Sequence, residues 1–190
     1  MLPDFAAAAT RLCSQCGMCC NGVMFHRVAL QPADSATELT AFGLKLKCKR
    51  GQHFLLQPCP AFRETHCAIY AARPERCRLF ECRQLQRLRT GGITEDMALK
   101  KIRGVKQLVR ELNEILGQMD EGTGKKNPLL KRCHQALSDS ALNGEGSELD
   151  VRLEGRMQEL DAMLDEDFRI ESEQNGKTRV TSNKIVRLKQ

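Results

Sequence analysis

The sequence has few aromatic residues: they make up 4% of its 190 residues, with one tyrosine and no tryptophan. A core built from this chain must therefore rest on aliphatic side chains, which the hydrophobic fraction of 41% can supply. A small domain of this kind usually needs a further constraint, such as a bound metal. The scarcity also argues against binding of single-stranded nucleic acid, which commonly relies on aromatic stacking.

Long apolar runs are also missing. After Thr10, charged residues interrupt every run before it reaches the eighteen or more residues typical of a membrane helix. The first ten residues contain Asp4 and no basic residue before Arg11, so they do not resemble a secretion signal. We therefore expect a soluble cytoplasmic protein with no membrane association. Disulfides are rare in that reducing compartment, so the ten cysteines point to metal binding or redox chemistry.

Cysteines and charge divide the chain at the same place. Nine of the ten cysteines fall within the first 82 residues. Residues 1–90 carry 13 Lys and Arg against 6 Asp and Glu, whereas residues 91–190 carry 17 against 18. We predict an α+β fold in two parts, a small irregular cysteine-rich metal-binding domain over 1–90 and a mainly α-helical extension over 91–190 with a flexible basic tail. We interpret the basic excess as offsetting metal-bound thiolates, and nucleic acid is not an expected partner.

Local patterns predict the secondary structure of both parts. In the first, they indicate a helix over 3–12, a turn at Asn21-Gly22, a strand over 23–30, a helix over 32–42, a basic connection over 45–50, and a compact, turn-rich segment over 59–82. In the second, Thr94 and Ser147 are predicted helix N-caps, because apolar residues recur every three or four positions after each. Pro128 is expected to open a helix through Leu137, and Asn175-Gly176 is a possible hairpin turn.

Four cysteines stand within eight residues in the pattern C-x2-C-G-x-C-C: Cys13, Cys16, Cys19 and Cys20. The two-residue spacing lets the backbone curl so that sulfurs and the following amides point into one concavity, and Gly17 permits the positive φ that such a curl often needs. Amides directed at sulfur stabilise the thiolate, which is the form that binds metal. Packing alone does not explain this density, whereas Cys48 and Cys133 each stand alone and are interpreted as ordinary thiols.

Two metal chemistries use this spacing. Three cysteines at C-x2-C-x2-C with a remote Cys-Pro, here Cys59-Pro60, match the arrangement of bacterial ferredoxin clusters. The C-x2-C-G unit alone is also a zinc knuckle, which a second pair of cysteines would complete, either Cys59 with Cys67 or Cys77 with Cys82. The spacing favours iron–sulfur modestly and does not decide which sulfurs share a metal.

The later cysteines continue the pattern among characteristic neighbours: Cys59-Pro60, then Cys67-Ala68-Ile69-Tyr70-x2-Arg73-Pro74-x2-Cys77-Arg78-x-Phe80-x-Cys82. Over roughly residues 12–83 the chain resembles the YkgJ-like cysteine-cluster family, which is described as zinc- or iron-chelating and carries a CxxCxxCC motif. The resemblance does not extend to residues 91–190. It implies metal binding, without fixing the metal, by Cys13, Cys16, Cys19, Cys20, Cys59, Cys67, Cys77 and Cys82.

Tyr70, Arg73 and Arg78 lie among these cysteines and are candidates for contacts with the cofactor. Phenol and guanidinium groups can donate hydrogen bonds to sulfur and so tune a redox potential. The alternative is that Tyr70 packs in the domain and that the arginines are surface residues. No catalytic residue is identified, and an all-cysteine site is typical of a closed metal centre, because catalytic zinc keeps an open position.

We expect a metal-binding protein with an iron–sulfur cluster as cofactor, serving electron transfer, redox sensing or delivery of a metal or cluster. The alternative cofactor is zinc, in a module that is stabilised by metal, binds other proteins and performs no chemistry. A third reading is an enzyme with a thiolate nucleophile or a metal-activated water. The C-terminal helices are expected to cover the cysteine-rich part and to offer a surface to a protein partner.

Overall fold

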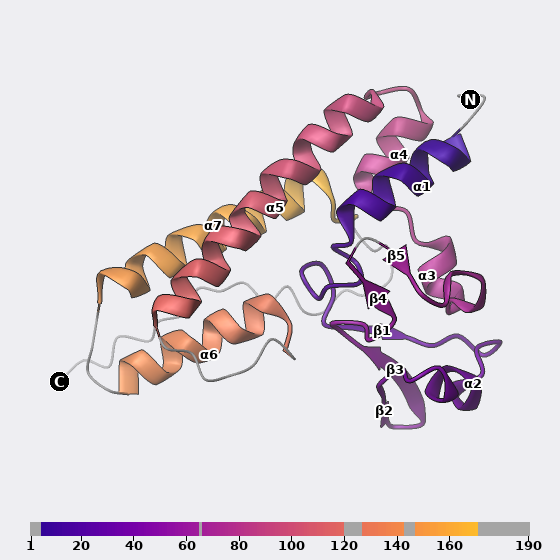
Figure 1. Cartoon of the computed structure of the whole chain (residues 1–190), viewed down its shortest axis with the longest axis horizontal. Coiled ribbons are helices and arrows are strands. Elements are labelled where there is room, and N and C mark those ends of the chain that lie inside the picture. Colours follow the sequence, from indigo (N-terminus) through magenta and orange to yellow (C-terminus); the bar gives the residue numbers. More distant parts are fainter. Residues whose placement is uncertain (1–4, 65, 120–126, 143–146, 171–190) are drawn as a thin grey trace.

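The computed structural model describes residues 5–64, 66–119, 127–142 and 147–170. Figure 1 shows long helices on one side of the molecule and short strands and turns on the other, so the predicted α+β class is confirmed. The helices are α1 (Phe5–Cys16), α2 (Ala36–Ala41), α3 (Glu75–Leu79), α4 (Arg83–Arg89), α5 (Glu95–Gln118), α6 (Leu129–Leu142) and α7 (Glu148–Asp167), with a 3-10 turn, η1 (Tyr70–Ala72). The strands are β1 (Arg27–Ala29), β2 (Leu46–Lys49), β3 (Gln52–Leu56), β4 (Phe62–Arg63) and β5 (His66–Cys67).

The helical side is organised around α5 and α7, which run antiparallel beside each other (Figure 1). Both predicted N-caps are confirmed. The Thr94 hydroxyl accepts a hydrogen bond from the Met97 amide, and Ser147 forms a reciprocal capping box with Asp150. The apolar stripe of α5 is buried from Ala98 to Leu116 and faces the stripe of α7, as their helical periodicity requires.

The main core joins the helical side to the cysteine-rich side. It contains Leu12 of α1 and Leu88 of α4 together with the buried stripes of α5, α6 and α7. After α7, Phe168 is 1% exposed, and its carbonyl accepts a hydrogen bond from the Arg83 amide at 3.0 Å. Residues on both sides of the expected boundary at residue 90 therefore share one core, and the division into 1–90 and 91–190 stays a prediction.

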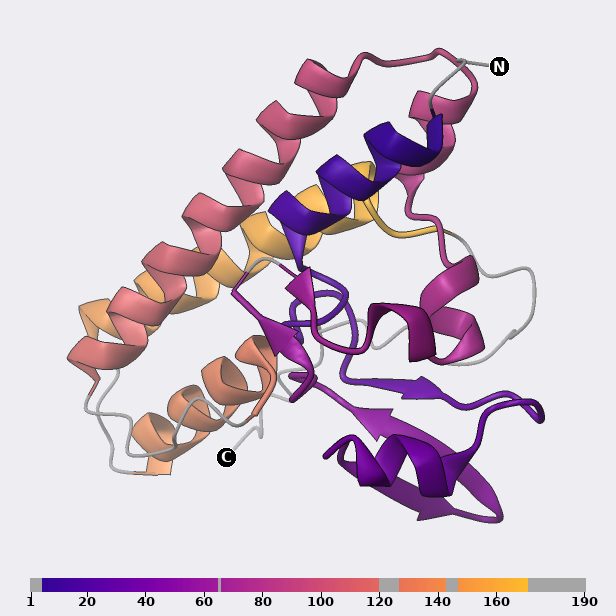
Figure 2. The same cartoon turned by 45° about the vertical axis from the view of Figure 1, so that its right-hand side comes forward.

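The strands form two small sheets below α1 (Figure 2). The larger is antiparallel in the order β1-β3-β2, and its β2–β3 turn places Arg50 and Gly51 at φ of +53° and +77°. The smaller pairs β4 with β5, so that Phe62 faces Cys67. A second, smaller core lies beneath these sheets and consists of Leu30, Leu39, Leu44, Leu55 and Ala61.

Several element boundaries differ from the sequence-based expectations. The first helix continues through Cys16 instead of ending near residue 12. The strand expected over 23–30 is confined to β1, because Val23 and Met24 are buried in the main core. Residues 46–49 are not a connection but strand β2, since hairpin pairing with β3 stabilises a segment whose basic side chains point to solvent.

The remaining differences concern helix ends. Helix α2 begins after the N-cap Ser35 and not at Pro32, because the Ser35 hydroxyl accepts a hydrogen bond from the Glu38 amide. Helix α6 continues five residues past Leu137, and α4 was not predicted. The possible hairpin at 175–176 and the basic tail lie outside the described residues. Among the described helices, none is long and apolar enough to span a membrane.

Candidate metal centre

The first four cysteines lie where α1 ends. Cys13 and Cys16 are one helical turn apart, so their side chains share a face of α1. Gly17 then adopts φ of +69°, as its place in the motif predicts, and this left-handed residue terminates the helix. The Gly17 carbonyl accepts hydrogen bonds from the amides of Cys20 and Asn21, each at 2.9 Å. The resulting turn brings Cys19 and Cys20 back beside the helix end.

Four sulfurs gather near the end of α1, and we call them the first cysteine group: Cys13, Cys16, Cys19 and Cys82. Cys82 joins from the N-cap position of α4, and its charge raises the pKa of each of the other three thiols. Cys16, Cys19 and Cys82 also pack against the main core. The next residue, Arg83, anchors this position by donating hydrogen bonds to the carbonyls of Asp165 and Glu166 at the end of α7.

The other four family cysteines lie together near the small sheets and form the second cysteine group: Cys20, Cys59, Cys67 and Cys77. The charges of Cys59, Cys77 and Cys67 all raise the pKa of Cys20, and the Cys59 amide donates a 2.8 Å hydrogen bond to the Cys20 carbonyl. Cys59, Cys67 and Cys77 pack against the second core. The Asp34 carboxylate accepts a hydrogen bond from the Glu75 amide and so fixes the start of α3, which carries Cys77.

Burial raises the pKa of seven of these eight thiols and so favours their protonated form in the metal-free protein. Desolvation is the largest cause in each case, and it raises the pKa of Cys16 and Cys20 to about 12 and that of Cys77 to about 11. Backbone amides oppose it at three positions. The Met18 amide lowers the pKa of Cys16, and the amides of Ala61 and Phe62 lower that of Cys59. The amides of Leu85, Gln84 and Cys82 lower the pKa of Cys82. Metal binding must therefore displace protons from these sulfurs.

Two cations lie near the sulfurs. The charge of Arg73 lowers the pKa of both Cys13 and Cys77, so this arginine acts on one thiol of each group. Lys106 lowers the pKa of Cys16, and its ammonium donates a hydrogen bond to the Gln15 carbonyl at 3.0 Å. Such charges would offset the negative charge of metal-bound thiolates.

Of the three candidate cofactor residues, Arg73 is the one whose charge reaches the cysteines. Its guanidinium stacks 3.5 Å from the centre of the Tyr70 ring and donates a hydrogen bond to the Tyr70 carbonyl at 2.9 Å. Tyr70 is 52% exposed, so it supports Arg73 instead of packing in a core. Arg78 is exposed on α3.

The two cysteines outside the family pattern lie elsewhere. Cys48 is exposed on β2, where it pairs with His53 across the hairpin. Cys133 is buried on α6 within the main core. No disulfide joins any of the ten cysteines, all of which lie in the described part of the chain. The structure therefore separates the eight pattern cysteines from the two that the sequence marked as ordinary.

The donor set fits a metal. Each group supplies four thiols, which is the number that a closed zinc site or an iron–sulfur cluster uses. Within the described ranges, however, no three Cys, His, Asp or Glu side chains are already arranged closely enough to hold a metal ion. The thiols of each group must therefore turn toward one another on binding.

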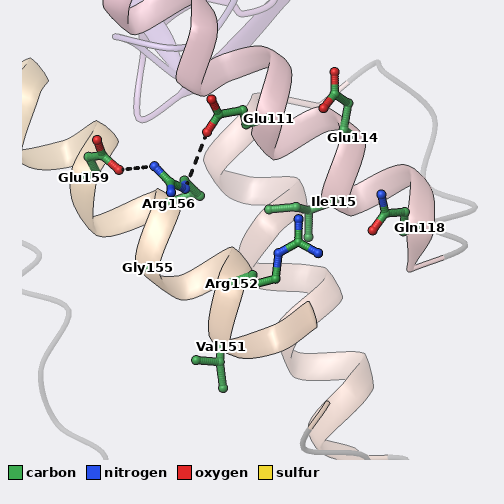
Figure 3. Close-up of a pocket in the computed structure, with 9 residues that line it drawn as sticks. All are labelled: Glu111, Glu114, Ile115, Gln118, Val151, Arg152, Gly155, Arg156 and Glu159. Carbon is green, nitrogen blue, oxygen red and sulfur yellow. Dashed lines mark hydrogen bonds and ion pairs between the residues drawn. The ribbon is translucent and has the colours of Figure 1, made fainter. Parts of the chain in front are cut away.

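A surface cavity of about 660 Å³ lies elsewhere, between α5 and α7 (Figure 3). Its lining carries both signs of charge, and Arg156 forms ion pairs there with Glu111 and Glu159. No cysteine lines it, so it is separate from both cysteine groups.

Sequence reasoning missed two residues that shape the centre. Lys106 comes from the middle of α5, and nothing in the helix pattern marks it as a neighbour of Cys16. Phe62 packs so closely on Gly17 that a Cβ there would lie 2.3 Å from its Cζ atom. Both contacts join segments distant in sequence, so no local motif signals them.

Comparison with known families supports the reading of the cysteines. Residues 12–102 match the CxxCxxCC family, described as a "Putative zinc- or iron-chelating domain". The match confirms the resemblance drawn from the motif and extends it into α5. No curated protein and no solved structure is significantly similar to the chain.

Proposed function

Because residues 12–102 belong to the CxxCxxCC family, we propose that this protein binds metal through the eight cysteines of that segment. The preferred cofactor is an iron–sulfur cluster, and the proposed role is electron transfer, redox sensing or delivery of a metal or cluster. The observation that carries the proposal is that these eight thiols lie near one another in two groups of four, whereas Cys48 and Cys133 belong to neither group.

The cysteine spacing favours iron–sulfur over zinc, and two further features suit a cluster. The C-x2-C-x2-C spacing of Cys13, Cys16 and Cys19 is the one that ferredoxin clusters use. Backbone amides act on the sulfurs of Cys16 and Cys59, and hydrogen bonds to sulfur tune the potential of such clusters. Arg73 supplies a positive charge that would favour a reduced, more negative cluster.

Zinc is the second candidate, because groups of four thiols equally suit closed tetrahedral sites. In that case metal binding would contribute folding energy and no chemistry. The two candidates share the protein's own contribution, which is to bring four thiols together, shield them with an apolar core and place a cation beside them. When bound, an iron–sulfur cluster would add the ability to accept and donate single electrons.

We also propose a reducing, cytoplasmic location and a protein partner that binds the C-terminal helices. Ten cysteines that form no disulfide among the described residues suit a reducing compartment. Val151 on α7 is 72% exposed and lines the cavity between α5 and α7, which gives a partner an apolar contact point. Capture of a partner by the wild-type protein and by the Glu154→Lys control, but not by Val151→Lys, would support this surface, whereas equal capture by all three would refute it.

The first experiment is an anaerobic purification followed by an absorption spectrum and iron, zinc and sulfide analysis of one sample. We expect a brown protein with matching iron and sulfide. Cys16→Ser should lower both, and the matched control Cys48→Ser should leave them unchanged.

Two results would contradict the preferred cofactor. A colourless protein with stoichiometric zinc and no sulfide would replace iron–sulfur by the zinc alternative. A protein that retains neither metal, and that binds neither after anaerobic reconstitution, would refute metal binding by this chain.

A further inference from the structure

We propose that the eight cysteines form two separate metal centres, and that the adjacent residues Cys19 and Cys20 belong to different ones. The inference rests on the proposed metal binding and adds which sulfurs share a metal. The first centre takes Cys13, Cys16, Cys19 and Cys82, and the second takes Cys20, Cys59, Cys67 and Cys77.

The hydrophobic packing divides six of the eight cysteines in this way. Cys13 shares a face of α1 with Cys16, and the contacts described below place Cys20. Cys16, Cys19 and Cys82 contact the main core, whereas Cys59, Cys67 and Cys77 contact the second core. The two sets of sulfurs therefore have different apolar surroundings. A single site built from both sets would need thiols to leave one core and enter the other.

The backbone at Cys20 explains how neighbouring residues are divided. The Cys20 amide donates a hydrogen bond to the Gly17 carbonyl and so belongs to the turn that follows α1. Its carbonyl accepts the 2.8 Å hydrogen bond from the Cys59 amide, which ties the chain after the turn to the second cysteine group. Cys19 precedes this junction and packs on the main core. Charge interactions support the same division. After burial, the largest effects on the pKa of Cys19 come from Cys16 and Cys82, and those on the pKa of Cys20 come from Cys59 and Cys77.

An aromatic ring marks the boundary between the groups. Phe62 pairs with Cys67 in the β4–β5 hairpin, and its ring packs directly on Gly17, between Cys16 and Cys19 in sequence. The β4–β5 hairpin, which carries Cys67 of the second group, thus covers the turn at Gly17 in the first group.

Electrostatics also suit two neighbouring centres. A zinc ion bound by four thiolates carries a net charge of about −2, so two such centres repel each other. Arg73 acts on Cys13 in the first group and on Cys77 in the second, and the Tyr70 ring holds it in place. One guanidinium between the groups would therefore reduce the repulsion.

Coordination numbers favour two centres over a single shared site. Structural zinc takes four ligands, and the common iron–sulfur clusters are likewise held by four cysteines. One centre would use half of the thiols and leave four without a role, whereas two centres use all eight.

The test compares two variants that differ by one position along the chain, Cys19→Ser and Cys20→Ser. Each protein is loaded with zinc, freed of excess metal and treated with N-ethylmaleimide, and the modified cysteines are mapped by peptide mass spectrometry. The wild-type protein should hold two zinc ions and protect all eight thiols. Each variant should hold one zinc ion.

The protection patterns should be complementary. Cys19→Ser should expose Cys13, Cys16 and Cys82 and leave the second group protected. Cys20→Ser should expose Cys59, Cys67 and Cys77 and leave the first group protected. Cys48 serves as a positive control for labelling, because it is exposed in every protein. Cys133 reports folding, because it is fully buried in the main core.

The possible failures are distinguishable. A wild-type protein that binds no zinc refutes the proposed function itself. A wild-type protein that protects all eight thiols, combined with variants that each lose protection in both groups while Cys133 stays unlabelled, retains metal binding and overturns the two-centre assignment.

A variant in which Cys133 is labelled has lost its fold. In that case the two-centre assignment is tested on the wild-type protein alone. Zinc is removed stepwise with a chelator, and labelling is followed at each step. The proposal is supported if the thiols become reactive in two separate steps, with the four thiols of one cysteine group exposed in each step. Simultaneous exposure of all eight, or sets with other members, overturns it.

Discussion

Zinc loading of the metal-free protein should release nearly as many protons at pH 9 as at pH 7. Burial raises the pKa of seven of the eight pattern cysteines, and four of the values are about 11 or 12. These thiols remain largely protonated at pH 9 and must lose their protons on binding. We therefore expect release of about six or more protons per chain at pH 9, against about two for eight thiols with the ordinary pKa of about 8.5.

The assay is isothermal titration calorimetry with zinc in several buffers of different ionisation enthalpy, at pH 7 and at pH 9. The slope of the binding enthalpy against the buffer ionisation enthalpy gives the number of protons released. Cys48→Ser provides the control, because this thiol lies outside both cysteine groups. A fall in proton release to about a quarter between pH 7 and pH 9 would show that the thiols titrate normally, and the reasoning from burial would be wrong.

The same pKa shifts predict a pH dependence of stability. A thiol whose pKa is raised in the folded state stabilises the fold below its unfolded pKa of about 8.5, and this contribution is lost as the pH rises through the folded pKa. The metal-free protein should therefore lose stability from about pH 9 toward the folded values of about 11 for Cys77 and about 12 for Cys16. The free energy of unfolding measured in urea should fall less over the same pH range for the zinc-loaded protein, since its thiols are already bound as thiolates. Equal slopes with and without zinc would contradict this.

Three substitutions test the supporting structure, each by urea denaturation. Gly17→Ala should lower the free energy of unfolding by about 2–4 kcal/mol, because the added Cβ meets Phe62 and the positive φ is strained. The control Gly91→Ala, with a positive φ and open space around it, should lower it by about 1 kcal/mol. Equal losses would contradict the Phe62 contact. Ser147→Ala removes the N-cap of α7 and should cost about 1 kcal/mol, so an unchanged midpoint would refute the cap. Asp167→Asn should cost about 2 kcal/mol, because this buried carboxylate holds two cations; a loss below about 0.5 kcal/mol would argue against those pairs.

Local sequence patterns determined the helices α5 and α7 and the chemistry of the cysteine motif. Apolar spacing and a capping residue suffice for a long amphipathic helix, because its hydrogen bonds are local and one face must be buried. The same holds for Gly17, since the turn after α1 needs a positive φ whatever the rest of the chain does. Sequence patterns did not predict β2, because pairing with β3 makes a strand of basic residues within 45–50. They also did not predict α4, which is short and carries few apolar residues.

Only the tertiary structure decided which sulfurs come together. The sequence offered Cys59-Pro60 as the fourth partner of the first three cysteines, but the fold brings Cys82 to them and places Cys59 beside Cys20. This choice depends on the docking of α4 against the end of α7 and on one backbone hydrogen bond between distant segments. Such contacts form between residues 39 or more positions apart, and no spacing rule encodes them. Motif spacing therefore determined which thiols form a candidate metal site, and packing determined how those thiols are grouped.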